Sequence, residues 1–376
     1  MWKLIPITIF SILMAWLSHR QSEYDPINCK YKNKEKLFYT IMAIGLILFA
    51  GLRVHYNDTG TYTYIYSVVA NNVSEGLSLT EDIEWLKIGE NPGFVFTMRL
   101  MGYLNFSSQD FLMVFSVLTV GVNLWFFKKY SCNIWLSVLL YIAFAGYIFN
   151  LAAIKQCTAM AFCLIGTDRA IDKKYWRFVF YVILAALFHP YALMYLVVPF
   201  LVFRPWSAYT WIMLAAFAVG GFGLEAMLGG LLSVTDMLGE NYDASSFMGE
   251  GVNPLRLLVT AVPSVVALLA AKQIAEDEDR EQYVMVNLTM LNAEIMFVAL
   301  FGTANYFARL ANYFIPFQAL SIPWLLKHFD KNGKRTMTVF AAMGYAMFFI
   351  YSQSLHESFD NNYYSTTLWK YLGSLF

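Results

Sequence analysis

Hydrophobic and polar positions alternate along the chain in long blocks, and the apolar blocks approach the length of a membrane-spanning helix. A helix that crosses the hydrocarbon core needs about 20 apolar residues, with about 17 as the lower limit. The blocks predict an all-α, polytopic membrane protein with about 11 or 12 transmembrane or re-entrant helices. The predicted spans are Leu4–Leu17, Leu37–Leu52, Phe111–Phe127, Ile134–Phe149, Leu151–Ala170, Trp176–Phe188, Tyr191–Phe203, Trp211–Leu228, Leu255–Ala271, Tyr283–Phe301, Phe307–Leu326 and Met337–Tyr351.

Two of these blocks are short and lie on either side of one proline. Trp176–Phe188 and Tyr191–Phe203 meet at His189-Pro190. They are interpreted either as two spans or as one re-entrant hairpin. Both interpretations return the chain to the same side of the membrane, so the rest of the topology does not depend on the choice.

Short basic loops give the orientation, because cytoplasmic loops carry an excess of lysine and arginine. When the spans alternate, all of these loops fall on one side, which is predicted to be cytoplasmic. Their basic residues are Arg20, Lys30, Lys32, Lys34, Lys36, Lys128, Lys129, Arg169, Lys173, Lys174, Arg177, Arg204, Lys327, Lys331, Lys334 and Arg335.

The remaining loops then lie outside, and residues 1–376 form a single integral membrane domain. The outer segments are the loop 54–92, the loop 225–254 and the C-terminal tail 354–376. Residues 93–104 are apolar but too short to span, so they are predicted to form an amphipathic helix on the outer surface. Residues 1–18 are interpreted as a retained first span, because no small-residue cleavage site follows them.

One loop conflicts with this orientation. Residues 276–279 are acidic throughout, yet the alternation of spans places them with the basic loops. Acidic residues contribute little to orientation, so the topology is kept.

Composition supports a membrane protein and argues against a nucleic-acid partner. The chain is 59% hydrophobic and only 14% charged, whereas soluble domains carry roughly 25% charged residues. Its 26 basic and 26 acidic residues give a net charge of zero, and a nucleic-acid-binding protein usually has a basic excess. The four cysteines have no metal-binding spacing.

Four polar groups gather at the outer level of the predicted spans, although none was used to derive the topology. They are Arg53 at the end of the second span, Lys155-Gln156 about one turn into the fifth, His189 at the apex of the hairpin, and Arg309, which Asn312 and Tyr313 follow. Cations held in a low dielectric require an anion. Asp58 or Glu90 would supply it in a buried ion-pair network, and a bound phosphate or pyrophosphate would supply it in a ligand site.

Several short motifs occur in an order that resembles a known family. The chain resembles the EpsG-like family of Wzy-type polysaccharide polymerases over most of its length. Lys155 departs from the family pattern, which usually has arginine before the glutamine. The motifs are Gly51-Leu52-Arg53, Asp58-Thr59-Gly60-Thr61-Tyr62, Glu90-Asn91-Pro92-Gly93-Phe94, Lys155-Gln156, Asp172-Lys173-Lys174, Ala185-Ala186-Leu187-Phe188-His189, Arg309 and Tyr363-Tyr364.

The resemblance implies a glycosyltransferase C-like helical bundle in the bacterial inner membrane. It implies an enzyme that joins oligosaccharide repeat units carried on undecaprenyl pyrophosphate at the outer face, with the lipid pyrophosphate as leaving group. The product would be an O-antigen, an exopolysaccharide or a capsule. The implied partners are these lipid-linked glycans, membrane lipid, and a flippase and a chain-length regulator of the same pathway.

That chemistry requires cations for the leaving group and a base for the acceptor hydroxyl. The candidates for pyrophosphate binding are Arg53, Lys155 and Arg309. The candidate bases are Asp58, His189, His55 and Glu90, with Asp58 or His189 preferred. Gln156, Tyr62, Asn312 and Tyr313 are candidates for substrate binding. Because cations can replace a metal in this role, no metal or other cofactor is predicted, and the acidic outer loop is a candidate lid.

Two other classes of function are compatible with the same cations. A ligase that moves finished glycan to another acceptor, or a transferase that uses a polyprenyl-phosphate sugar, needs a similar site. A glycolipid flippase or transporter would be expected to have repeat halves and broken helices near the bilayer middle. The sequence shows no internal repeat.

Overall fold

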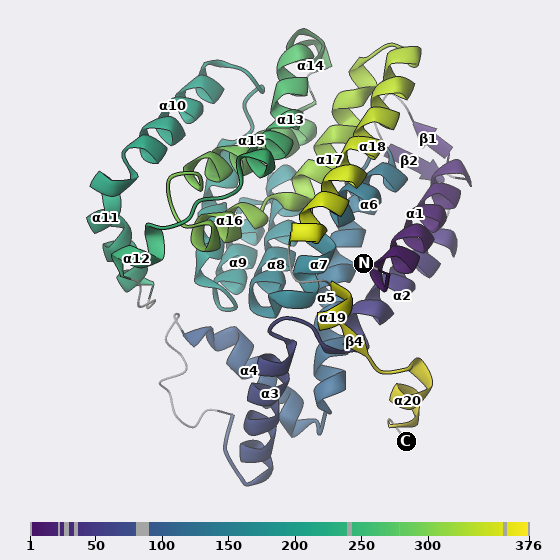
Figure 1. Ribbon diagram of the computed structural model, residues 1–376, viewed down its shortest axis with the longest axis vertical. Coiled ribbons are helices and arrows are strands. Elements are labelled where there is room, and N and C mark those ends of the chain that lie inside the picture. Colours follow the sequence, from purple (N-terminus) through teal and green to yellow (C-terminus); the bar gives the residue numbers. More distant parts are fainter. Residues whose placement is uncertain are drawn as a thin grey trace.

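The computed structural model describes residues 2–21, 23–25, 30–33, 37–79, 90–238, 243–277, 279–355 and 359–374, and most of them are helical (Figure 1). This confirms the predicted all-α class. The elements of the first half are α1 (Leu4–Gln21), β1 (Glu23–Asp25), β2 (Lys30–Asn33), α2 (Leu37–Gly51), β3 (Arg53–His55), α3 (Thr59–Ser74), α4 (Pro92–Tyr103), α5 (Ser108–Tyr130), α6 (Ile134–Ala143), α7 (Gly146–Ala152), α8 (Ile154–Ile171) and α9 (Tyr175–Ala186).

The second half begins with an unusually long 3₁₀ helix, η3, that has proline at its first position and again near its end. The elements are η3 (Pro190–Phe200), α10 (Ala208–Phe222), α11 (Leu224–Met237), α12 (Ala244–Phe247), α13 (Pro254–Leu269), α14 (Ala271–Asp277), α15 (Arg280–Val298), α16 (Ala304–Asn312), α17 (Ile315–Leu325), η4 (Leu326–His328), α18 (Lys331–Leu355), α19 (Phe359–Asn362), β4 (Tyr364–Ser365) and α20 (Leu368–Gly373).

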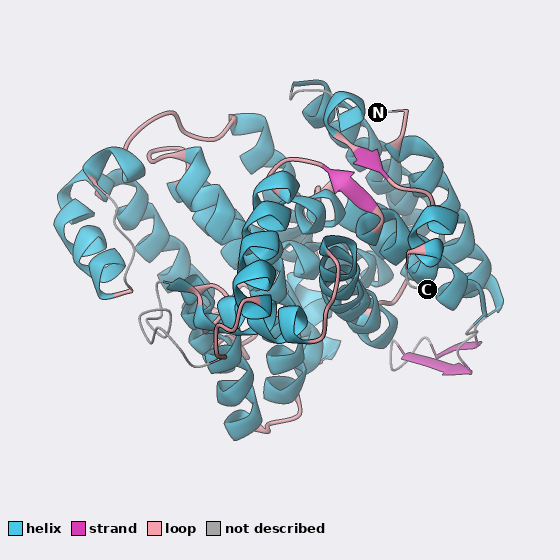
Figure 2. Cartoon of the chain, turned by 90° about the horizontal axis from the view of Figure 1, so that it is seen from below, coloured by secondary structure: helices cyan, strands magenta, loops and turns pink. Residues whose placement is uncertain are grey.

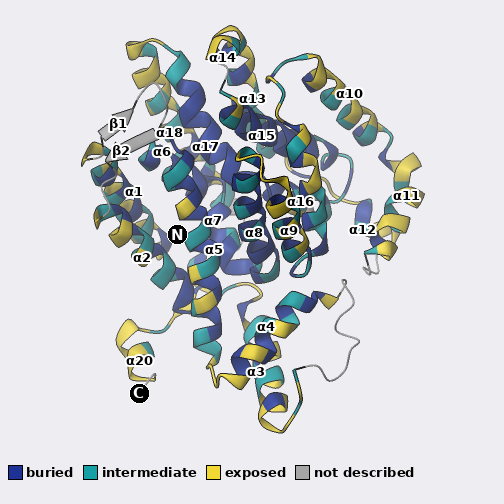
Figure 3. Cartoon of the chain, turned by 180° about the vertical axis from the view of Figure 1, so that it is seen from behind, coloured by how far each residue is buried: buried dark blue, intermediate teal, exposed yellow. Residues whose placement is uncertain are grey.

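The core is formed by α5, α6, α8, α15 and α17, which Figure 3 shows as the most deeply buried helices. Every residue of α17 is buried. The outer helices expose large apolar side chains, among them Trp176, Phe200, Phe222 and Leu269. Such an exposed apolar surface is typical of a protein that contacts lipid or another apolar partner.

Few of the described helices are both long and apolar enough to cross a membrane unaided. Among the described residues, α5 is long and apolar enough to cross a membrane alone, and three bent helix pairs raise the count to at most 4. A capping box starts α5, because the Ser107 hydroxyl accepts from the Asp110 amide and the Asp110 carboxylate accepts from the Ser107 amide. The described helices fit a membrane protein, and the count of 11 or 12 spans stays a prediction.

Several predicted spans are interrupted, so the prediction of continuous helices was wrong there. Ile134–Phe149 bends by 52° between α6 and α7, and Trp211–Leu228 bends by 95° between α10 and α11. Ala145 has φ 60 at the first bend, a left-handed conformation that a helix interior does not contain. Phe307–Leu326 breaks between α16 and α17 because Pro316 cannot donate a helical hydrogen bond.

Helices also occur where the sequence predicts outer loops. Within the loop 54–92, α3 buries Thr59, Tyr66 and Val73 at intervals of two helical turns, and it packs against α4. The predicted surface helix 93–104 is present as α4. The outer loop 225–254 contains α11 and α12, and the C-terminal tail contains α19, β4 and α20. The acidic residues Glu81, Asp82 and Glu84 of the candidate lid lie outside the described residues.

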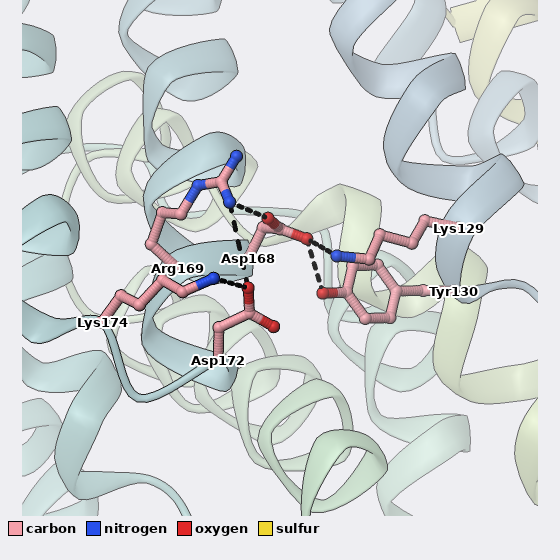
Figure 4. Close-up of polar contacts among 6 residues, drawn as sticks. All are labelled: Lys129, Tyr130, Asp168, Arg169, Asp172 and Lys174. Atoms are coloured by element: carbon pink, nitrogen blue, oxygen red, sulfur yellow. Dashed lines mark hydrogen bonds and ion pairs between the residues drawn. The ribbon is translucent and has the colours of Figure 1, made fainter.

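One end of the molecule collects the basic loops, and we call it the basic end. Asp168 accepts from Lys129 and from the Tyr130 hydroxyl at 2.8 Å, and its other oxygen lies 3.6 Å from Arg169 (Figure 4). The acidic loop that conflicted with the topology lies here too, because Asp277 contacts Lys327 at 2.6 Å. This ion pair explains how an acidic loop lies among basic ones.

The opposite end carries a small sheet that joins both ends of the chain. β3 pairs antiparallel with β4, with Arg53 opposite Ser365 and His55 opposite Tyr364 (Figure 2). The Lys3 ammonium donates to the Tyr363 carbonyl at 2.7 Å. The Tyr363 ring stacks on Phe49 at 4.6 Å, so the C-terminal tyrosines fasten the tail over the end of α2.

Asp168→Ala should lower the free energy of unfolding by about 2 kcal/mol, because it leaves the Tyr130 hydroxyl and two cations without their acceptor. Thermal unfolding in detergent measures this change. The matched control is Asp172→Ala, whose side chain is 34% exposed and whose removal should cost no more than about 0.5 kcal/mol. Equal effects of the two substitutions would contradict an anchoring role for Asp168.

Candidate functional site

Arg53 is enclosed between α2, α3 and α5 and is only 1% exposed. Its guanidinium donates to the Ala50 carbonyl, to the Thr59 hydroxyl at 3.2 Å and to the Ser116 hydroxyl at 3.1 Å. All three partners are neutral, and no carboxylate pairs with Arg53 in the described part of the chain. Arg53 therefore contributes a buried positive charge, but it lies too deep to touch a ligand in this conformation.

Lys155 lies in the first turn of α8, where free backbone amides and the helix dipole also favour an anion. The Tyr62 side chain, from α3, interacts with the Lys155 backbone and lies within the electrostatic influence of Asp58 and Arg309. Asp58 is the N-cap of α3, yet its exposed carboxylate accepts no capping hydrogen bond. Helices far apart in sequence thus bring Asp58, Tyr62, Lys155 and Arg309 together.

His189 lies at the turn between α9 and η3. Its Nδ1 is 2.7 Å from the hydroxyl of Tyr313, a residue that is fully buried. Burial, and to a smaller extent the positive charges of Lys155 and Arg309, together lower the pKa of His189 to about 3. His189 is therefore neutral at physiological pH, and it shares Lys155 and Arg309 as neighbours with Tyr62.

Gln156 fixes the position of Arg309 through the backbone. Its side-chain amide donates to the Arg309 carbonyl at 2.7 Å. The Arg309 guanidinium is exposed, and in the described part of the chain it has no hydrogen-bond or ion-pair partner. Gln156 and Tyr313 were both predicted to bind substrate. In the structure, Gln156 holds the Arg309 backbone by a hydrogen bond, and Tyr313 holds the His189 ring. We call Tyr62, Lys155, His189 and Arg309 the cation site.

The turn that contains Glu90 docks directly against the His189 turn. The Gly93 amide donates to the Leu187 carbonyl at 2.8 Å. A Cβ at Gly93 would lie 2.9 Å from the Phe188 ring and 3.0 Å from the Leu187 Cβ. Glu90 itself is exposed. Two motifs that the sequence places nearly 100 residues apart are therefore in contact, and this contact requires glycine.

A cavity of ≈ 590 Å³ adjoins the cation site, and His55 and Asn312 line it. His55 Nδ1 donates to the Asn362 carbonyl at 2.7 Å, which leaves Nε2 as an acceptor in the neutral ring. Arg256, in the first turn of α13, also lines the cavity, and it donates to the Asn312 side chain at 3.2 Å. The sequence analysis missed Arg256, although it begins a predicted span in the same way as Arg309.

The structure thus divides the predicted residues between two neighbouring regions. Lys155, His189, Arg309 and Tyr62 form the cation site, with Asp58 beside it, whereas His55 and Asn312 belong to the cavity. The described residues contain no group of three His, Cys, Asp or Glu side chains that could hold a metal ion. The absence of a metal requirement stays a prediction.

The chain matches one known protein family over most of its length. The EpsG family model matches residues 36–371, which is nearly the whole chain. The chain belongs to the EpsG family. Members of this family are Wzy-type polymerases with glycosyltransferase-like character. The match to the EpsG family includes every element of the cation site and of the cavity. No curated protein and no solved structure matches the chain.

Gly93→Ala should destabilise this EpsG-family protein by about 1–3 kcal/mol, because the new Cβ would collide with Leu187 and Phe188. Thermal unfolding in detergent measures the loss. Gly60→Ala is the matched control, since a Cβ there meets nothing within 4 Å, and it should be neutral or slightly stabilising within a helix. A Gly93→Ala protein as stable as wild type would contradict the close contact.

Proposed function

We propose that this protein polymerises a polysaccharide by transferring a lipid-linked glycan to a second lipid-linked repeat unit. The donor is an oligosaccharide on undecaprenyl pyrophosphate, and the reaction takes place at the outer face of the bacterial inner membrane. The observation that carries the proposal is the convergence of Lys155 and Arg309 on one histidine from separate helices. Membership in the EpsG family supports a polymerase-like role.

Lys155 and Arg309 bind the pyrophosphate of the donor in this proposal. Arginine contacts two phosphate oxygens at once and lysine acts as a point charge. The free amides in the first turn of α8 add donors beside Lys155. Arg53 lies beneath them and adds charge without contact. Together these fixed charges stabilise the negative charge that develops on the departing pyrophosphate.

Asp58 is the better supported of the two preferred bases. His189 has a lowered pKa of about 3 and uses one ring nitrogen for Tyr313, so it accepts a proton poorly. The Asp58 carboxylate is exposed and has no side-chain hydrogen-bond partner among the described residues. It also lies between the two regions, because its neighbour Asn57 lines the cavity while Tyr62 belongs to the cation site.

The proposed step balances without a cofactor. An acceptor hydroxyl oxygen forms a bond to the anomeric carbon of the donor, and its proton passes to the Asp58 carboxylate. The bond from the anomeric carbon to the pyrophosphate oxygen breaks, and its electron pair leaves with the pyrophosphate. The proton on Asp58 then returns to solvent. His189 is neutral before the donor binds, and it forms a hydrogen bond beside the pyrophosphate.

Purified protein incubated with a lipid-pyrophosphate repeat unit should produce a ladder of longer glycans, which gel electrophoresis or mass spectrometry detects. Lys155→Met and Arg309→Gln should each lower the rate by about 10²–10³, the cost of removing one preorganised donor. Asp58→Asn should lower it by about 10²–10⁴, the usual contribution of a general base.

Arg335→Gln provides the control, because Arg335 is exposed at the basic end, and its ladder should match the wild type. Thermal unfolding verifies that each variant is folded. A single-step product in place of a ladder would indicate a ligase or a single-sugar transferase. Unchanged ladders from folded Lys155→Met and Arg309→Gln would show that the cation site does not bind the donor.

A further inference from the structure

We propose that the ≈ 590 Å³ cavity binds the terminal sugars of the acceptor glycan. This inference rests on the proposed function, because it assigns the second substrate of the same transfer reaction. The cation site would hold the donor pyrophosphate, and the neighbouring cavity would hold carbohydrate. The volume lies within the range of small-molecule sites, which is roughly 300–1,000 Å³.

The lining has the chemistry of a carbohydrate site. Amide side chains come from Asn57, Asn312 and Gln353, and aromatic rings come from Tyr56 and Phe348, among others. The side chains of Asn57 and Gln353 have no hydrogen-bond partner in the described part of the chain, so they are available to sugar hydroxyls. Sugars have polar edges and apolar ring faces, which require both kinds of group. Among the described residues, none that lines the cavity carries a carboxylate.

Arg256 supplies donors that the protein itself does not use. Its guanidinium has five N–H donors, and among the described residues its one side-chain acceptor is Asn312, at 3.2 Å. The remaining donors face a cavity that water or hydroxyl groups must fill, since a cation in an apolar surrounding needs partners. Arg256 can therefore bind neutral sugar hydroxyls or an acidic sugar.

The backbone around the cavity is broken at several places, which indicates a wet interior. The α6–α7 break contributes Phe144 and Ala145, and the α16–α17 break contributes Asn312 and Ile315. Non-helical backbone at membrane depth is tolerated where it is buried in protein or lines a water-filled space. Ala145 also holds φ 60, and such strain in a residue other than glycine is typical of ligand sites.

The position of the cavity suits an acceptor. Asn57 precedes the proposed base Asp58, Ala152 lies three residues before Lys155, and Asn312 lies three residues after Arg309. Three short segments of the chain therefore each carry one residue of the cation site, or its base, and one residue of the cavity. A sugar hydroxyl that leaves the cavity toward α3 reaches Asp58 before it reaches the donor.

The first experiment tests binding without turnover. A Gln353→Cys substitution places a thiol in the lining, and Cys29→Ser removes the cysteine that lies outside the described residues. The other cysteines, Cys132, Cys157 and Cys163, are buried. Labelling of Gln353→Cys with a water-soluble thiol reagent is followed by mass spectrometry. The probe is the oligosaccharide released by mild acid from the lipid extract of cells that lack the protein.

The released oligosaccharide should slow labelling of Gln353→Cys at least about tenfold near saturation, and inorganic pyrophosphate should not. Arg204→Cys is the matched control, because Arg204 lines a separate cleft near α10 and should label at the same rate with and without glycan. Protection by pyrophosphate alone, or by neither probe, overturns the acceptor assignment. Cells that accumulate no lipid-linked oligosaccharide would contradict the proposed function itself, and the inference would fall with it.

The second experiment separates the two substrates kinetically. With the lipid-free oligosaccharide as acceptor, Arg256→Gln and Asn312→Ala should raise the acceptor KM about tenfold and leave the donor KM unchanged. Arg256→Lys should recover part of the loss. Lys155→Met should show the reverse pattern. A rise in the donor KM for Arg256→Gln would show that the cavity belongs to the donor, while transfer by the wild type would still support the proposed function.

Discussion

Arg53 is enclosed where the end of α2, the start of α3 and the first half of α5 meet, and each group it contacts is neutral. Hydrogen bonds from Nε and Nη1 reach neutral acceptors, but they leave its positive charge uncompensated in a region of low dielectric. The surrounding structure holds this charge in place, because β4 pairs with β3 and Tyr363 stacks over the end of α2. The positions of Asp58, Tyr62 and the α3 start all follow from this buried arginine.

The cations at the two ends of the molecule differ in whether a carboxylate pairs with them. At the basic end Asp168 pairs with Lys129 and Arg169, and Asp277 pairs with Lys327. At the other end, Arg53, Arg256 and Arg309 have no carboxylate partner among the described residues. The chain has equal numbers of acidic and basic residues, so composition does not explain the difference. The proposed ligands, a pyrophosphate and a hydroxyl-rich glycan, would account for it.

The sequence predicted most helices and the common level of Lys155, His189 and Arg309, because hydrophobic blocks and basic loops determine helices and sides. It could not predict the bends, because the left-handed backbone conformation of Ala145 has no signature in the pattern of hydrophobic residues. Pro316 lies beside the α16–α17 break, but the sequence analysis predicted one continuous span there. Neither the burial of Arg53 nor the contact of Arg256 with Asn312 can be derived from spacing, because the partners come from distant helices. The cavity was missed for the same reason.

The two regions are coupled through His189. In the free protein, burial and the positive charges of Lys155 and Arg309 lower its pKa, so its free nitrogen is a weak acceptor. A pyrophosphate bound between Lys155 and Arg309 would neutralise both charges and leave burial as the main effect. The pKa of His189 would then rise, because an opposite charge nearby favours the protonated ring. His189 would form a stronger hydrogen bond to the bridging oxygen once the donor is bound. Asp58, which lies nearer the cavity, would accept the proton only when the acceptor hydroxyl binds. Donor binding would thus prepare the leaving group before the base acts.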